Sequence, residues 1–361
     1  MAFGEINIAK TMVETDKKCP SCGAVMGFDP STGGLKCSYC GHTEEISAED
    51  SAKERDFMSE EEKGNHDWGV ATKTVICKSC GAETVYDELQ IASECPYCGS
   101  NQVMEVKEAD TLAPEGVCPF RIDIKNAGTK FKKWISRKLF CPREAKKKAR
   151  PEAFKGVYLP YWTFDSDTKT SYRANYGIDR VVSDFKGKSR IVTDWHSTSG
   201  TYSEFIDDQT VLASVRHGEN LLSGVEPFVT KENVIYSPKY IAGFASERYS
   251  VGLKDAWEKA KILISRRLDN SITREIRARH NADRVSNLSL STIYTNIKYK
   301  YLLLPVWLSS FKYRGKLYQF AINGQTGRVS GKTPISPLRV AVAIFIFIAI
   351  LAFIYVSMQY M

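Results

Sequence analysis

Leu159-Pro160-Tyr161-Trp162 and Leu304-Pro305-Val306-Trp307 are the two segments from which the fold can be inferred. Two other pairs of segments repeat in the same order along the chain. Gly116-Val117-Cys118-Pro119-Phe120 matches Gly224-Val225-Glu226-Pro227-Phe228, and Ile135-Ser136-Arg137-Lys138-Leu139 matches Ile264-Ser265-Arg266-Arg267-Leu268. Three landmarks in one order predict a duplicated module, with residues 112–223 as the first copy and 224–335 as the second.

Each copy is expected to hold a short strand, an amphipathic helix and a strand that begins at Leu-Pro. Antiparallel hairpins are predicted around residues 191–195 and 318–322, where apolar and polar residues alternate, with a turn at Asn323-Gly324. The fold class is therefore α+β, with Trp162 and Trp307 in the core. The helical pattern rests on Phe131, Trp134, Ile135 and Leu139 in the first copy and Trp257, Ile262, Ile264 and Leu268 in the second.

Eight of the ten cysteines form two copies of the pattern C-x2-C-x14-C-x2-C. Two Cys-x-x-Cys turns can place four thiolates around one tetrahedral zinc ion, and a glycine after the second cysteine of each turn permits the required backbone. We therefore expect two zinc ribbons, at residues 1–42 and 71–110, each with one structural zinc. The predicted ligands are Cys19, Cys22, Cys37 and Cys40 for the first ion and Cys77, Cys80, Cys95 and Cys98 for the second.

Two other uses of these cysteines are weaker alternatives. A redox motif would need one Cys-x-x-Cys in a βαβ setting, and an iron–sulfur centre would also use four thiolates. A cross-braced pairing of the two patterns is disfavoured by the acidic residues that separate them. Cys118 and Cys141 have no cysteine at the equivalent positions of the second copy, so we expect them to be free thiols.

The net charge of +8 is unevenly distributed. Residues 125–155 hold twelve Lys or Arg against two Glu, whereas residues 43–67 hold ten Asp or Glu against three Lys or Arg. The acidic stretch predicts a solvated linker over residues 43–70. The basic stretch fits a solvated helix surface, a contact with anionic lipid, or a nucleic-acid contact.

A run without charge from Val340 to Val356 predicts a transmembrane helix over residues 338–357. Lys332 and Arg339 flank its amino side, and the N-terminus has no apolar run of signal-peptide length. Both features place residues before the helix in the cytoplasm, with the chain as a single-pass membrane protein. A reducing compartment also favours zinc ligands over disulfides.

Three segments resemble catalytic motifs without meeting their requirements. Gly327–Thr333 has one residue too few between its glycines for a phosphate-binding loop. Asp194, His196 and Ser197 fall on one strand, where alternate residues point to opposite faces. His42 and Glu44 fit half of a zinc-deaminase motif, without the cysteine half after them. We therefore expect a non-enzymatic protein without catalytic residues.

The paired ribbons, the two Leu-Pro segments, the turn at 323–327 and the apolar run are similar to a bacterial family of zinc-ribbon membrane proteins. Its members carry labels such as TFIIB-type zinc ribbon or primosomal helicase-like. Some resemble the membrane partner of PspA-type and flotillin-like SPFH proteins in the envelope-stress response. The resemblance implies a membrane adaptor that recruits cytosolic partners, with the eight cysteines as zinc ligands. The alternative is a membrane-tethered nucleic-acid-binding protein.

Overall fold

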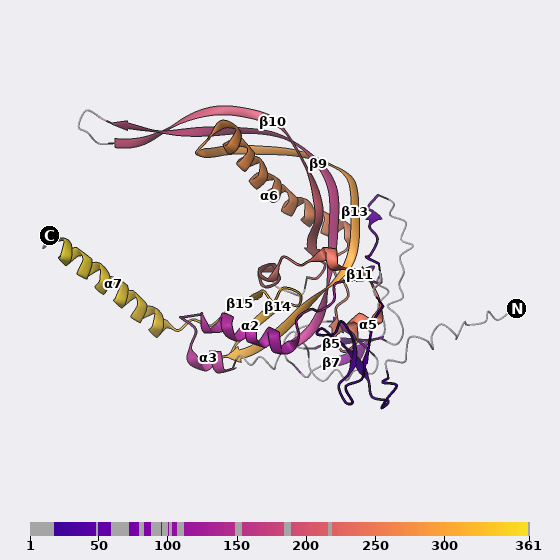
Figure 1. Ribbon diagram of the computed structural model, residues 1–361. Coiled ribbons are helices and arrows are strands. Elements are labelled where there is room, and N and C mark those ends of the chain that lie inside the picture. Colours follow the sequence, from indigo (N-terminus) through magenta and orange to yellow (C-terminus); the bar gives the residue numbers. More distant parts are fainter. Residues whose placement is uncertain are drawn as a thin grey trace.

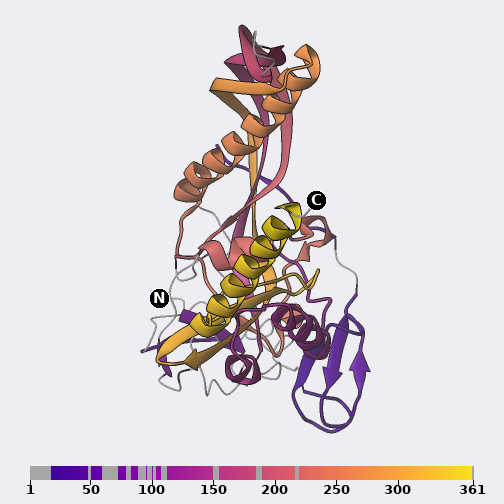
Figure 2. The same cartoon turned by 90° about the vertical axis from the view of Figure 1, so that its left-hand side faces the viewer.

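The computed structural model describes residues 18–47, 50–58, 72–78, 83–87, 95, 100, 103–106, 112–148, 154–183, 189–215 and 219–359. These residues form a base, a long curved arm that rises from the base, and a helix that leaves the base on the side toward which the arm curves (Figures 1 and 2). The architecture is mixed α+β, as predicted, with a four-cysteine cluster, a large antiparallel sheet and a C-terminal apolar helix.

A small three-stranded sheet carries the first four cysteines. Its strands are β1 (Met26–Asp29), β2 (Gly34–Cys37) and β3 (Thr43–Glu44), in the order β1-β2-β3. Both pairs are antiparallel, so β1 and β2 form a hairpin whose turn lies at residues 30–33. β1 and β2 fall within the predicted ribbon of residues 1–42, of which 1–17 lie outside the described residues, and β3 falls in the predicted linker.

Twelve other strands form one large sheet. Its main path is β11-β8-β13-β9-β12-β6-β5-β7, while β10 pairs with β9, β14 with β13, β15 with β14 and β4 with β13. The bounds are β4 Arg55–Asp56, β5 Thr72–Cys77, β6 Glu83–Asp87, β7 Val103–Val106, β8 Gly116–Val117, β9 Lys155–Ser183, β10 Ser189–Leu212, β11 Val234–Ile235, β12 Ala245–Ser246, β13 Arg284–Tyr313, β14 Lys316–Asn323 and β15 Val329–Gly331.

Helices cover this sheet and extend from it. The 28-residue helix α6 lies against β9, β10 and β13 in the arm, and α2 lies beside β15 in the base. Their bounds are α2 Ile124–Ser136, α3 Arg143–Lys148, α4 Glu219–Leu222, α5 Pro238–Ile241, α6 Leu253–His280 and α7 Pro337–Gln359, with short 3-10 turns η2 Ser223–Val225 and η3 Thr230–Glu232.

The two Leu-Pro segments pair with each other at the centre of the large sheet. β9 and β13 run antiparallel, and Leu159 faces Leu304. Proline has no N–H group to donate to a neighbouring strand. Pro160 and Pro305 each lie opposite the end of a neighbouring strand. The Pro160 carbonyl accepts the Ala213 N–H (2.9 Å) just after β10, and the Pro305 carbonyl accepts the Gly324 N–H (2.8 Å) just after β14.

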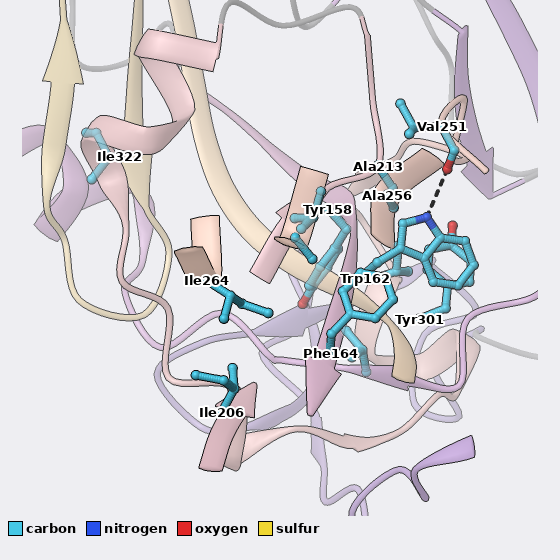
Figure 3. Close-up of a cluster of buried hydrophobic side chains, with 14 of the residues drawn as sticks. Tyr158, Trp162, Phe164, Ile206, Ala213, Val251, Ala256, Ile264, Tyr301 and Ile322 are labelled. Atoms are coloured by element: carbon cyan, nitrogen blue, oxygen red, sulfur yellow. Dashed lines mark hydrogen bonds between the residues drawn. The ribbon is translucent and has the colours of Figure 1, made fainter. Parts of the chain in front are cut away.

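Trp162 and Trp307 make equivalent hydrogen bonds that cross between the predicted copies. Trp162 Nε1 donates to the carbonyl of Val251 (2.9 Å), two residues before α6 (Figure 3). Trp307 Nε1 donates to the carbonyl of Ile122 (2.9 Å), two residues before α2. Both indoles are buried. These bonds are reciprocal between the two predicted copies, which share one sheet and one core.

The arm consists of residues 166–183 of β9, 189–206 of β10, 284–297 of β13, and α6. β-Bulges interrupt the register of β10 between Ile206 and Gln209 and of β13 between Thr295 and Lys298. Both bulges lie opposite residues 164–167 of β9, and each contains a residue with a left-handed backbone, Asp208 and Asn296. Bulges bend and twist strands, so these two account for the bend between base and arm.

Four details differ from the sequence prediction. Gly224-Val225, predicted as a strand, belongs to the 3-10 turn η2. Leu139 lies beyond the end of α2 and Ile262 lies on the open face of α6, so both are exposed. Part of the predicted acidic linker is also not a solvated segment. Its β4 pairs with Lys298 and Tyr299 of β13. Glu54 forms an ion pair with Lys298 (3.0 Å), and Ala52 is buried.

Helix α7 is long and apolar enough to cross a membrane. Residues Pro337–Met358 have a mean hydropathy of 2.9, and none of this segment is buried against the rest of the protein. A helix of 22 residues spans about 33 Å, which matches the hydrocarbon thickness of a bilayer. It contains the predicted span of 338–357.

Candidate metal centre

The structure brings Cys19, Cys22, Cys37 and Cys40 together. Their four sulfur atoms lie within 4.8 Å of one another. The Sγ–Sγ distance is 3.4 Å between Cys19 and Cys40 and 3.6 Å between Cys22 and Cys37. Zn–S bonds of about 2.3 Å in tetrahedral geometry separate the sulfurs by about 3.8 Å. The cluster therefore fits one zinc ion with four thiolate ligands.

Two turns of matching geometry position these sulfurs. The Cys19 N–H donates to the carbonyl of Ala24 (2.6 Å), and the Cys37 N–H donates to the carbonyl of His42 (2.8 Å). Gly23 and Gly41 follow the second cysteine of each turn and have positive φ angles of 73° and 78°. Glycine adopts this backbone without steric cost, which is why both turns place it there.

The backbone around the cluster favours thiolates. The N–H groups of Cys40 and Tyr39 lower the pKa of Cys37 to about 6. Cys19 and Cys37 are buried, whereas Cys22 and Cys40 face solvent. A site with four protein ligands has no open position for substrate, so this arrangement is suited to a structural role and not to catalysis by the metal.

The small sheet is attached to the base through β1. The Phe28 N–H donates to the carbonyl of Ala242 (2.9 Å), and the Phe28 ring packs against Tyr240 and Phe244 with centroid distances of 5.8 and 6.5 Å. Cys22, Cys40 and the largely exposed ring of Tyr39 face solvent. The ribbon therefore has one face bound to the base and one face open.

The described residues include two cysteines of the second pattern, Cys77 and Cys95. Cys77 ends β5, and both Cys77 and Cys95 are buried in one apolar cluster. The Cys95 N–H donates to the carbonyl of Ser100 (2.7 Å), which repeats the bond seen at Cys19 and Cys37. Cys80 and Cys98 lie outside the described residues. β5, β6 and β7 pair with each other and join the large sheet through β12, so the predicted second ribbon would be part of that sheet.

The remaining two cysteines, Cys118 and Cys141, belong to neither pattern, although Cys118 shares an apolar cluster with Cys77 and Cys95. Cys118 is buried, and burial raises the pKa of its thiol well above the usual range. Cys141 packs with Ala145 and Tyr313 in a separate small cluster. Neither forms a disulfide within the described part of the chain.

The acid, base and hydroxyl at residues 194–197 are engaged with different partners. Asp194 pairs with Arg180 (2.6 Å), the His196 ring stacks on Tyr176 with centroids 5.2 Å apart, and Ser197 Oγ donates to Asn175 Oδ1 (3.2 Å). The strand geometry thus keeps these groups apart.

A polar cluster at the bend, in which Asp165 and Lys300 are buried, was not predicted. We call Glu54, Asp165, Asp208 and Lys300 the bend cluster. Lys300 Nζ lies 2.8 Å from Asp208 Oδ1 and 3.6 Å from Glu54 Oε1, and the Asp208 N–H donates to Asp165 Oδ1 (2.6 Å). Burial raises the pKa of Asp165 to about 7, and its hydrogen bond to Glu54 helps lower the pKa of Glu54. Asp165 follows the segment Leu159–Trp162 by three residues, but its partners come from distant segments.

The basic region lies at the start of α7. Arg339 Nη1 donates to the carbonyls of Leu139 (2.9 Å) and Cys141 (2.8 Å), and the Ser336 N–H donates to the carbonyl of Phe140 (2.9 Å). Leu139 and Phe140 are exposed here, between the basic helices α2 and α3. The contact fixes the cationic segment beside the end of the apolar helix.

The chain is 31% identical over 332 residues to the uncharacterized protein YdjG of Bacillus subtilis strain 168, covering 90% of this chain and 91% of that protein. The chain belongs to the YdjG family. This YdjG-family chain is also 36% identical over 86 residues to a protein named Transcription factor S from Methanocaldococcus jannaschii, which covers 24% of the chain and 68% of that protein. No family model matches the chain, and no solved structure matches it significantly.

Proposed function

We propose that the protein is a non-enzymatic, membrane-anchored zinc-ribbon adaptor that recruits cytosolic proteins to the inner face of a bacterial membrane. The observation that carries this proposal is the contact between the basic region and the start of α7. If α7 spans the bilayer, this contact holds Lys and Arg side chains of α2 and α3 at the level of anionic headgroups. Each such charge contributes about 1 kcal/mol near an anionic surface.

The orientation follows from the same charges. Lys332 and Arg339 precede the apolar part of α7, and positive residues are retained on the cytoplasmic side. The base, the ribbon and the arm then lie in the cytoplasm. Exposed Leu139 and Phe140 would enter the bilayer interface beside α7.

The zinc sites would serve as rigid supports for partner binding. We propose one zinc at Cys19, Cys22, Cys37 and Cys40, supported by the sulfur geometry, and a second at Cys77, Cys80, Cys95 and Cys98, supported by the repeated turn at Cys95. The open face of the first ribbon, with Tyr39, is the surface we propose for a protein partner. The motif resemblance favours PspA-type or SPFH proteins of the envelope-stress response as partners.

The lipid contact can be tested in nanodiscs that contain the full chain. We expect hydrogen–deuterium exchange of residues 134–148 to be slower in anionic than in neutral lipid. A triple change, Lys133→Gln, Lys146→Gln and Lys147→Gln, should abolish this difference while leaving exchange in the ribbon unchanged. Equal exchange in both lipids would contradict the proposed contact.

The adaptor role can be tested by affinity purification from detergent extracts followed by mass spectrometry. Proteins recovered with the wild-type chain should be lost with the Cys22→Ser, Cys40→Ser variant. The same proteins should be recovered less well from a chain that ends at residue 335, because it no longer concentrates them at the membrane. Identical recovery with the ribbon variant would contradict an adaptor function of the ribbon.

A second candidate function is nucleic-acid binding. The local similarity to a protein named Transcription factor S favours it, together with the basic region. In that case DNA or RNA should bind with a strong dependence on salt, and Lys146→Gln with Lys147→Gln should reduce the affinity and the salt dependence.

A further inference from the structure

A pocket of about 380 Å³ lies beside the open edge of β10, at the point where this strand leaves the arm. One wall is α6, the floor is the end of β10 (residues 210–212), and the opposite wall is formed by α4 and η2 (residues 220–226). We call this site the β10 groove. On α6 it is lined by Lys259, Ile262, Leu263 and Arg266, which share one face of the helix at helical spacing.

The floor of the β10 groove offers backbone groups that pair with no other described strand. Among the described strands, β10 pairs with β9 alone. The Ala213 N–H points toward β9, since it donates to Pro160, and the register is continuous from Gln209 to Leu212. Because backbone groups alternate in direction along an antiparallel strand, Thr210 and Leu212 direct their N–H and carbonyl groups into the groove. The Thr210 carbonyl accepts a bond from the side chain of Gln209 (3.1 Å), which an incoming chain could replace.

The walls combine apolar and cationic side chains. Ile262 is 55% exposed and Leu263 is 37% exposed, so both offer apolar surface to an incoming side chain. Lys259 and Arg266 lie on either side of them, and no carboxylate of the described residues forms an ion pair with either one. Beneath the floor, the fully buried hydroxyl of Tyr161 has no hydrogen-bond partner in the described part of the chain.

We propose that the β10 groove binds an extended segment of a partner protein as an added strand, with acidic and apolar side chains directed at α6. The backbone of that segment would pair with Thr210 and Leu212, and its side chains would be selected by α6, as in other cases of strand addition. Residues at alternate positions of a strand are about 6.7 Å apart, and Lys259 and Arg266 are separated by about 10 Å along α6. Acidic residues on both sides of one apolar residue are then about 13 Å apart, and the long, flexible side chains of Lys259 and Arg266 can reach both of them.

Among the described residues that line this groove, Glu226 is the one acidic group. Burial raises its pKa to about 7, so that at neutral pH it is uncharged in about half of the molecules. It therefore opposes an acidic ligand only weakly, and its protonated form can donate a hydrogen bond. This inference rests on the proposed adaptor function and specifies how one partner would be recognised.

The test uses fluorescence anisotropy with the full chain in detergent and three short labelled peptides. In the first, glutamate, valine and glutamate alternate with threonine. In the second, lysine replaces glutamate, and the third repeats the first with methylated backbone nitrogens. We expect the first peptide to bind and the other two to bind about tenfold more weakly or not at all.

Two variants locate the site on the protein. Thr210→Pro removes one N–H that faces the groove without removing a bond to β9, and should abolish binding. Lys259→Glu with Arg266→Glu should reverse the preference in favour of the lysine peptide. The control Arg274→Glu, about two turns farther along α6, should change nothing. Equal binding of all three peptides, or no effect of the charge reversal, would overturn the proposal, and the peptide comparison stands even if Thr210→Pro fails to fold.

Two further outcomes separate this inference from its alternatives. If the chain self-associates and Thr210→Pro dissociates it, the occupant is a second copy and the proposal of a partner segment is wrong. If partners recovered by affinity purification are lost with the ribbon variant but retained with the charge reversal on α6, the groove proposal fails and the adaptor function stands.

Discussion

Asp165 lies in β9 at the bend between base and arm, and its pKa is unusually high for an aspartate. It is buried in the bend cluster, and burial raises its pKa from 3.8 to about 7. The folded state therefore retains a proton that the unfolded chain releases, so stability falls as pH rises from about 4 to about 7 and levels off above it. Asp165→Asn keeps the shape and removes this ionisation.

We expect the unfolding midpoint of the Asp165→Asn variant in detergent to fall less between pH 5 and pH 8 than that of the wild type. Glu226 also has a raised pKa of about 7. Glu226→Gln therefore serves as a matched variant that removes the separate contribution of Glu226 to the pH dependence of stability. If the unfolding midpoint of Asp165→Asn decreases as much as that of the wild type, Asp165 is ionised throughout this pH range.

Trp162 and Trp307 define a second prediction for single residues. Trp162→Phe leaves the buried carbonyl of Val251 without its donor, which should lower the free energy of unfolding by about 1–3 kcal/mol. Trp307→Phe removes the equivalent bond to Ile122 and should cost a similar amount. Chemical denaturation in detergent measures both, and a neutral effect of Trp162→Phe would mean that this bond does not stabilise the pairing of the two copies.

The first ribbon is the element whose loss should be tolerated best. It has its own sheet and its own small core, and it contacts the base through Phe28 and Ala242. If both proposed zinc ions bind, Cys37→Ser should lower the zinc content from two to one per chain and leave the circular dichroism spectrum nearly unchanged. Metal analysis of the purified protein measures the zinc content per chain. A wild-type content of one zinc would contradict the second ribbon.

The sequence predicts the ribbon, the apolar helix and the two Leu-Pro strands because each depends on local spacing. It does not predict the length of β9 and β13, which have 29 and 30 residues, because strands usually have three to ten. The bulges at Asp208 in β10 and at Asn296 in β13 shift the alternation of buried and exposed residues. The period of two is therefore broken within each of these strands. The bend cluster was missed for a related reason, since Glu54, Asp165 and Lys300 meet only after long-range pairing.

At the scale of the whole molecule, α7 should decide where the protein is found. A chain that ends at residue 335 lacks the apolar helix but keeps the base, so it should move from the membrane fraction to the soluble fraction after cell lysis. Immunoblots of both fractions measure this. A truncated chain that stays fully in the membrane fraction would show that another segment, such as the basic region, is enough for attachment.

The central position of β13 has a consequence for synthesis on the ribosome. This strand separates β8 from β9 in the sheet, yet it is made more than a hundred residues after both. The apolar stretch at 156–164 can pair with β10 and β12 earlier, but its other edge must wait for Arg284–Tyr313 to emerge, and such delays expose nascent chains to aggregation and to chaperones. We expect stalled nascent chains to become resistant to protease only after Tyr313 has left the exit tunnel.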